Sequence, residues 1–264
     1  QAKLTPELEQ KIYAADNKTT LEDLYLPYKP KRRTKSQIAK EAGLEPLALS
    51  LLENQAQEPL LLAAQYLNPE ANINNPQDAL DGARYILLDV FAENAALLAK
   101  LRERFTYEGI LCAKVIAGKE EQGAKFSDYF AHQELVKSIP SHRALAILRG
   151  NNEGFLNIAI EYPELQTLAR GEVSHFEQLI IAEFAITDNL AASNWLRECV
   201  RLTWKAKIYP SLENELLGIM REQADTEAIK VFATNLHNLL LQAPAGSKTT
   251  LGLDPGIRTG VKAA

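Results

Sequence analysis

Residues 210–242 read PSLENELLGIMREQADTEAIKVFATNLHNLLLQ. Large apolar side chains recur in this stretch at three- and four-residue intervals, the spacing of one broad helical face. They are Leu212, Leu216, Ile219, Met220, Ile229, Phe232, Leu236, Leu239 and Leu240. A continuous helix of about 30 residues is roughly 45 Å long. The stretch therefore predicts a helical rod that acts as a spine for the other elements.

Helical patterns also occupy most of the preceding chain. Residues 189–242 are helical in pattern, with one break expected at Pro210 because proline lacks the amide donor of an interior helical residue. Asn75-Pro76 predicts the start of a long helix that ends near Phe105. Residues 141–150 predict a short helix that is capped by a serine and ended by Gly150.

Residues 38–44, which read IAKEAGL, have the small residue and the glycine of a helix-turn-helix turn. A helix that reads DNA bases carries Arg, Lys, Asn or Gln toward the base edges. Residues 47–52 instead read LALSLL, the composition of a buried helix. We therefore expect helix-turn-helix geometry here, but we do not expect the second helix to read DNA bases.

A small helical subdomain inserted at about residues 44–130 is a further expectation.

Strand patterns are sparse. Residues 110–117 and 124–130 predict a hairpin around a charged loop, and residues 155–160 predict a third strand. Residues 249–253 and 259–263 predict a second hairpin, with a turn at Asp254-Pro255-Gly256. Because an isolated two-stranded hairpin is marginally stable at best, we expect the natural protein to continue and this chain to be a fragment.

The composition is that of a globular protein, with 46% hydrophobic and 24% charged residues in 264. The chain has no membrane-length apolar run and no basic-then-apolar leader, so no membrane contact is expected. Cys112 and Cys199 lie far apart without a CxxC motif, which fits a reducing cytoplasm and argues against structural zinc. The expected class is mainly α: an irregular multi-helix assembly around a long central helix, with a truncated β-hairpin at the C-terminus.

The charge is unevenly distributed. The whole chain carries −5, yet the stretch from Leu24 to Lys40 holds six cations and no carboxylate. This basic run (Lys29, Lys31, Arg32, Arg33, Lys35 and Lys40) carries +6, which leaves −11 on the remainder. Any electrostatic contact with a polyanion is therefore expected to be local.

Four stretches follow one another along the chain: LEDLYLPYKPKRRTK (21–35), PSHRALAILRGNNEG (140–154), EAIKVFA (227–233) and LGLDPGIRTG (251–260). Together, and in this order, they resemble the Tex family of bacterial transcription accessory proteins. The resemblance implies that residues 1–247 are the helical N-terminal and central region of Tex, and that residues 248–264 open its YqgF-type, RNase H-like domain. Family members continue into helix-hairpin-helix elements and an oligonucleotide-binding barrel, which are thought to carry much of the nucleic-acid affinity.

The basic run is the first candidate site. Its cations would neutralise phosphates and release counterions, while Tyr25 and Tyr28 would stack on unpaired bases. The alternative is a stiff connector whose leucines and tyrosines pack on the core and whose cations face water or carboxylates. Pro27 and Pro30 suit either interpretation.

Residues 140–154 hold the second candidate, Arg143 and Arg149. His142 and Arg143 fall in the first turn of a predicted helix, where the helix dipole disfavours cations. A bound phosphate would resolve the conflict. A carboxylate, for example from the Glu120-Glu121 region, would do so equally well.

Asp254 is the sharpest chemical candidate. The resemblance implies that Asp254 lies in an RNase H-like domain. In nucleases of that type the first strand ends in an aspartate that helps to hold divalent metal ions. One carboxylate cannot form that site, and the YqgF-type domain of Tex is regarded as lacking the remaining catalytic set, so Asp254 is expected to be vestigial. Arg258 is its expected partner. We expect no catalytic residue, metal or cofactor, since the sequence holds no GxGxxG, P-loop or HExxH motif.

The sequence therefore predicts a non-enzymatic, cytoplasmic, transcription-associated protein that binds nucleic acid, with RNA or single strands favoured, by phosphate neutralisation. The alternative is an interaction scaffold that positions downstream nucleic-acid-binding domains or contacts the transcription machinery. The −11 outside the basic run favours the scaffold. A metal-dependent nuclease would need carboxylates beyond Asp254.

Overall fold

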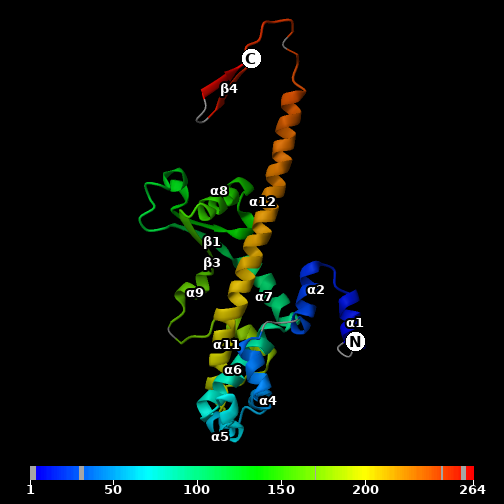
Figure 1. Ribbon diagram of the computed structural model, residues 1–264, viewed down its shortest axis with the longest axis vertical. Helices are drawn as coiled ribbons and strands as arrows, with labels where there is room; N and C mark the ends of the chain where they lie inside the picture. The colour runs from blue at the N-terminus through cyan, green and yellow to red at the C-terminus, as the bar shows by residue number, and fades with distance from the viewer. Residues whose placement is uncertain (1–3, 30–32, 170, 245, 257–259) are drawn as a thin grey trace.

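A computed structural model describes residues 4–29, 33–169, 171–244, 246–256 and 260–264. Its long axis is a helical rod that begins with α11 (Ser193–Thr203), passes through a π-helical turn, η6 (Trp204–Ile208), and continues as α12 (Tyr209–Leu240). Figure 1 shows the other elements distributed along this rod. The predicted spine and the mainly α class are confirmed.

The expected break at Pro210 is wrong, because the helix continues without interruption through this proline. The π-helical turn directly before it shifts the hydrogen-bond pattern, and the amide of Tyr209 bonds to the carbonyl of Trp204, five residues earlier. Pro210 follows at the first positions of α12, where a missing amide donor is tolerated.

The N-terminal half is a series of short helices. The predicted helix 75–105 is two helices, because Asn94 interrupts it and accepts a hydrogen bond from the amide of Leu97 at 2.9 Å. The helices are α1 (Pro6–Tyr13), α2 (Lys18–Tyr25), α3 (Lys35–Glu41), α4 (Glu45–Glu53), α5 (Pro59–Ala63), α6 (Pro76–Ala92) and α7 (Ala95–Glu108), with the 3₁₀ turns η1 (Leu26–Tyr28), η2 (Ala64–Tyr66) and η3 (Pro69–Ala71).

A left-handed turn at Gly43 separates α3 from α4. Gly43 adopts a positive φ of 83°, and the amide of Leu44 bonds back to the carbonyl of Ala39 at 3.1 Å. In α4 the side chains of Leu47, Ala48 and Leu51 are buried, as the apolar composition indicated.

A three-stranded antiparallel sheet lies beside the middle of the rod. Its strands are β1 (Ile110–Val115), β2 (Ala131–Leu135) and β3 (Leu156–Glu161), in the order β2-β1-β3. The predicted strand at 124–130 is wrong: it is the 3₁₀ helix η4 (Ala124–Tyr129). Its amides bond three residues back, as Phe126 does to Gly123, and this turn leads the chain into β2.

Helix α8 (Ser141–Asn152) packs against the sheet and α12, and η5 (Val136–Ser138) precedes it. The expected end at Gly150 is wrong, since α8 continues to Asn152 and the chain turns at Gly154, where φ is +74°. Gly150 instead permits close packing: a Cβ there would lie 2.6 Å from a Leu156 methyl carbon. Pro140, and not Ser141, occupies the N-cap position.

Helices α9 (Pro163–Thr167) and α10 (His175–Glu183) complete the body. Aromatic side chains join α10 to the rod and the start of α9 to α7. The ring centroids of Phe176 and Trp204 are stacked 4.5 Å apart, and those of Phe105 and Tyr162 lie 4.7 Å apart. Within the described residues, no helix is both long and apolar enough to cross a membrane.

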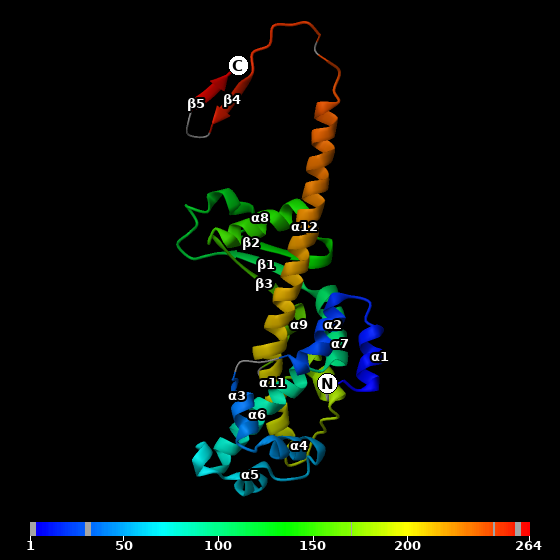
Figure 2. The same cartoon turned by 45° about the vertical axis from the view of Figure 1, so that its right-hand side comes forward.

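The C-terminal hairpin pairs β4 (Leu253–Gly256) with β5 (Gly260–Ala263). The predicted turn at residues 254–256 is wrong, because Asp254 and Pro255 are paired strand residues opposite Lys262 and Val261. A proline fits there because both strands of a hairpin are edge strands. Figures 1 and 2 place this hairpin beside the far end of α12, away from the helical body.

Candidate nucleic-acid interface

The described part of the basic run lies at the surface, directly after η1 and in and just before α3. Four of its cations are described, namely Lys29, Arg33, Lys35 and Lys40, and all four are exposed. Lys31 and Arg32 lie outside the described residues. The run begins at Lys29, directly after η1, and ends in α3. The Thr34 hydroxyl caps the first turn of α3, because it accepts a hydrogen bond from the Gln37 amide at 3.2 Å.

Three of these cations have partners. A carboxylate oxygen of Glu41 lies 3.0 Å from Arg33, and Lys40 is 2.7 Å from Glu45. Lys35 donates to the hydroxyl of Tyr85 at 3.1 Å. Exposed ion pairs contribute about 0–1 kcal/mol, so a phosphate group can replace the carboxylate at little cost.

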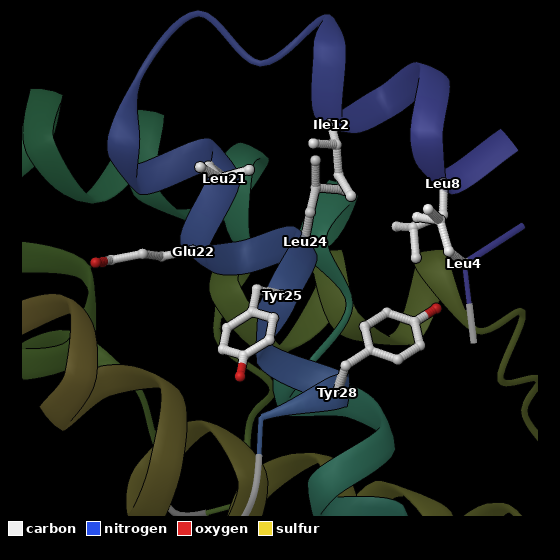
Figure 3. A pocket seen from close by; sticks show the side chains of 8 residues that line it. All are labelled: Leu4, Leu8, Ile12, Leu21, Glu22, Leu24, Tyr25 and Tyr28. Atoms are coloured by element: carbon white, nitrogen blue, oxygen red, sulfur yellow. The ribbon is translucent and has the colours of Figure 1, made fainter. Parts of the chain in front are cut away.

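Tyr25 and Tyr28 are exposed, but both also line an apolar groove between α1 and α2. The groove has a volume of about 430 Å³ and is walled by leucines and Ile12 (Figure 3). Neither α1 nor α2 contributes a buried residue. The two rings therefore have an apolar environment of their own beside the basic run.

Arg143 is held by a carboxylate. Its Nη1 atom lies 2.7 Å from both carboxylate oxygens of Glu134 in β2, and His132 Nε2 lies 3.1 Å from the same carboxylate. The partner is thus Glu134 and not the Glu120-Glu121 region. Arg149 is exposed and has no partner among the described residues.

Burial by itself raises the pKa of Glu134, but the hydrogen bonds and charges of Arg143 and His132 outweigh burial and lower that pKa below its usual value. A lowered folded-state pKa stabilises the fold above the unfolded pKa of about 4.3, and the stabilisation is lost as the pH falls through the folded value.

Glu134→Gln should therefore lower the free energy of unfolding by about 1 kcal/mol at pH 7, because the neutral amide loses the charge-assisted bonds. Between about pH 5 and pH 3 the variant should lose stability less steeply than the wild type. Urea unfolding followed by circular dichroism across this range measures both. Glu120→Gln, at an exposed carboxylate, is the matched control. Parallel pH profiles for wild type and Glu134→Gln would contradict the assignment.

The candidate sites are not gathered into one surface. Figure 2 shows α3 near the lower end of the rod, α8 beside its middle, and β4 beside its upper end. The structure therefore separates the basic run, the Arg143–Arg149 helix and Asp254 along its longest axis.

Asp254 is exposed and faces Lys262 across the hairpin. Arg258, its expected partner, lies outside the described residues. Among the residues that are described, no three His, Cys, Asp or Glu side chains form a group that could hold a metal ion.

A mixed-charge cleft beside the start of the basic run was not predicted. It has a volume of about 600 Å³, and Lys29, Asp89, Lys207 and the ion-paired Asp23, Arg102 and Glu215 line it. Lys207 pairs with Asp89. Since Arg102 lies 79 residues from Asp23 and 113 from Glu215, no local sequence signal indicates this cluster.

The fold defines this protein as a rod-centred helical module. A flanking sheet and an exposed basic segment accompany its helical rod. The family model described as Tex central region-like matches residues 54–232, and the chain belongs to this family.

Similar proteins are longer than this chain. The Transcriptional accessory protein Tex of Neisseria gonorrhoeae is 55% identical over 264 residues, and Protein tex of Bordetella pertussis is 51% identical over 271. Each alignment covers 100% of this chain and 34% of the relative. The human S1 RNA-binding domain-containing protein 1 is 29% identical over 92% of this chain and 25% of its own. The chain thus spans about a third of the length of its bacterial relatives.

Proposed function

We propose that this chain is the non-catalytic helical part of a transcription-associated protein, and that its basic run binds the phosphates of RNA or single-stranded nucleic acid. The names of two relatives support the coarse role, since one is a transcriptional accessory protein and another contains an S1 RNA-binding domain.

The observation that carries the proposal is the exposure of the basic run. Its four described cations all reach solvent, and the contacts of Arg33 and Lys40 are exposed ion pairs that a phosphate can displace. Tyr25 and Tyr28 lie directly before the run, where their exposed ring faces can stack on bases. Binding of this kind is independent of sequence and weakens with salt.

The two thiols are unsuited to covalent chemistry at neutral pH. Burial raises the pKa of Cys112 to about 11 and that of Cys199 to about 12. At neutral pH both groups are protonated, and a thiol is a weak nucleophile compared with a thiolate. Both cysteines are free and buried, which suits a core position in a reducing compartment.

The second candidate function is an interaction scaffold, in which this chain positions the nucleic-acid-binding domains of the full-length protein or contacts the transcription machinery. The acidic charge outside the basic run favours it, because −11 opposes a polyanion. The pairing of Arg143 with Glu134 also favours the scaffold function, as does the separation of the candidate sites along the rod.

Fluorescence anisotropy with labelled single-stranded RNA distinguishes the two functions. The affinity of the chain should fall by about 300-fold between about 50 and 200 mM salt if six phosphates of the single strand are neutralised. Lys31/Arg32/Arg33→Ala should bind at least about tenfold more weakly, and its slope of log affinity against log salt should be smaller by about 2.

The matched control is Arg201/Lys205/Arg221→Ala, which removes the same charge from exposed positions on the rod. It should bind almost as the wild type does. If the folded wild type fails to bind at tens of micromolar, or if both triple variants lose affinity equally, the basic run is not the interface and the scaffold function replaces the proposal.

A further inference from the structure

The environment of α12 changes along its length. In its first half Leu212, Leu216, Met220 and Ala224 are buried at intervals of four residues against the body. From Asp225 to Leu240, a stretch that is described throughout, no side chain is buried. The second half of the rod therefore contributes no buried side chain, although α8 packs along one of its faces.

The exposed half nevertheless carries an apolar seam. Ile229, Phe232, Leu236 and Leu239, here called the rod stripe, follow one another at intervals of three, four and three residues. Their exposed fractions are 68%, 67%, 41% and 65%. This alternation is the spacing with which one helix packs against another in a coiled coil. A contiguous apolar surface of this kind marks an interface.

Helix α8 covers only the neighbouring face of this half. His142 and Leu145 of α8 lie across a groove of about 500 Å³ from Ala228 and Val231, and Phe232 also lines it. The remaining three stripe residues are not part of the groove lining. The stripe is therefore open along its length and is accessible to a second helix.

The C-terminal hairpin indicates the source of that helix. Its apolar side chains Leu251, Leu253 and Val261 are all exposed, and two strands alone are marginally stable. The hairpin thus belongs to a larger domain. The segment 241–252 between α12 and β4 can extend to about 40 Å, whereas the stripe is roughly 15 Å long. A domain tethered in this way can reach every stripe residue.

We propose that the rod stripe is the docking surface for an amphipathic helix of the domain that β4 and β5 open, carried by the part of the full-length protein outside this chain. The relatives supply the required length, because this chain spans 34% of each bacterial one. A short tether gives an effective concentration in the millimolar range. The tethered domain therefore occupies the stripe in preference to a second copy at micromolar concentration.

Hydrogen–deuterium exchange on the full-length protein and on residues 1–264 tests the docking. The amides of residues 226–240 should exchange at least about tenfold more slowly in the full-length protein, because a docked helix suppresses local opening of the rod. Phe232→Glu/Leu239→Glu should restore fast exchange in the full-length protein. The same substitutions should leave the melting temperature of residues 1–264 unchanged, since both side chains are already exposed there.

The matched control is Lys230→Glu/Thr234→Glu, which places two carboxylates on the opposite, polar face of the same turns. It should retain slow exchange in the full-length protein. Equal exchange of residues 226–240 in the two wild-type proteins would overturn the proposal. Sedimentation that shows residues 1–264 to dimerise, and to become monomeric in Phe232→Glu/Leu239→Glu, would also overturn it, because the occupant would then be a second copy.

Discussion

Phe105→Ala is expected to lower the free energy of unfolding by about 3–5 kcal/mol, the range for truncating a large buried aromatic side chain. Phe105 is 1% exposed, and its ring centroid lies 4.7 to 6.2 Å from those of Tyr162, Phe176, Trp204 and Tyr209. These rings come from the residue after β3, from α10, from η6 and from α12. One truncation therefore removes contacts with four elements at once.

Urea unfolding followed by circular dichroism measures this loss. Thr106→Ala is the matched control, because Thr106 is the exposed neighbour in the same helix and its truncation should change stability by less than about 0.5 kcal/mol. A cost below about 1 kcal/mol for Phe105→Ala would show that the surrounding rings collapse into the space, and that this cluster does not join the body to the rod.

Local signals in the sequence were sufficient for the rod and for many helix ends. The three- and four-residue spacing from Leu212 to Leu240 predicts the rod because helical periodicity needs no knowledge of the partners. The spacing also predicts the seam of the exposed half. It does not indicate that the seam lacks a covering layer here, because burial depends on elements that pack from elsewhere in the chain.

The errors arise where tertiary packing overrides a local rule. Pro210 normally ends a helix, but the π-helical turn before it removes the conflict. Gly150 normally ends a helix too, yet it serves the close approach of Leu156. Each outcome depends on how the surrounding chain is hydrogen-bonded or packed, which the residue type alone does not specify.

The candidate site was predicted in part for the same reason. The composition of the basic run predicts an exposed segment, and its described cations are exposed. The carboxylate beside Arg143 was misassigned because the second strand was predicted at 124–130. With β2 at Ala131–Leu135, Glu134 falls beside α8, a placement that strand register alone decides.

Arg102→Met is the second large effect that we expect, with the free energy of unfolding lowered by about 3 kcal/mol. The Arg102 guanidinium in α7 lies 2.8 Å from an Asp23 oxygen in α2 and 2.6 Å from a Glu215 oxygen in α12. Burial opposes the charged guanidinium, but the hydrogen bonds and charges of the two carboxylates outweigh burial and raise its pKa. Without the guanidinium, two largely buried carboxylates have no neutralising charge beside them. This loss costs more free energy of unfolding than the ion pairs contributed.

The loss of stability should appear first in α1 and α2. Neither helix contributes a buried residue, and Arg102 joins α2 to both α7 and the rod. Limited proteolysis should cut residues 4–28 faster in Arg102→Met, before the remaining body unfolds. Lys100→Met is the matched control, since it breaks the more exposed Lys100–Glu183 pair on the same helix and should cost less than about 1 kcal/mol. Equal stability losses and equal cleavage in the two variants would mean that apolar packing, and not the Arg102 cluster, attaches α1 and α2 to the rod.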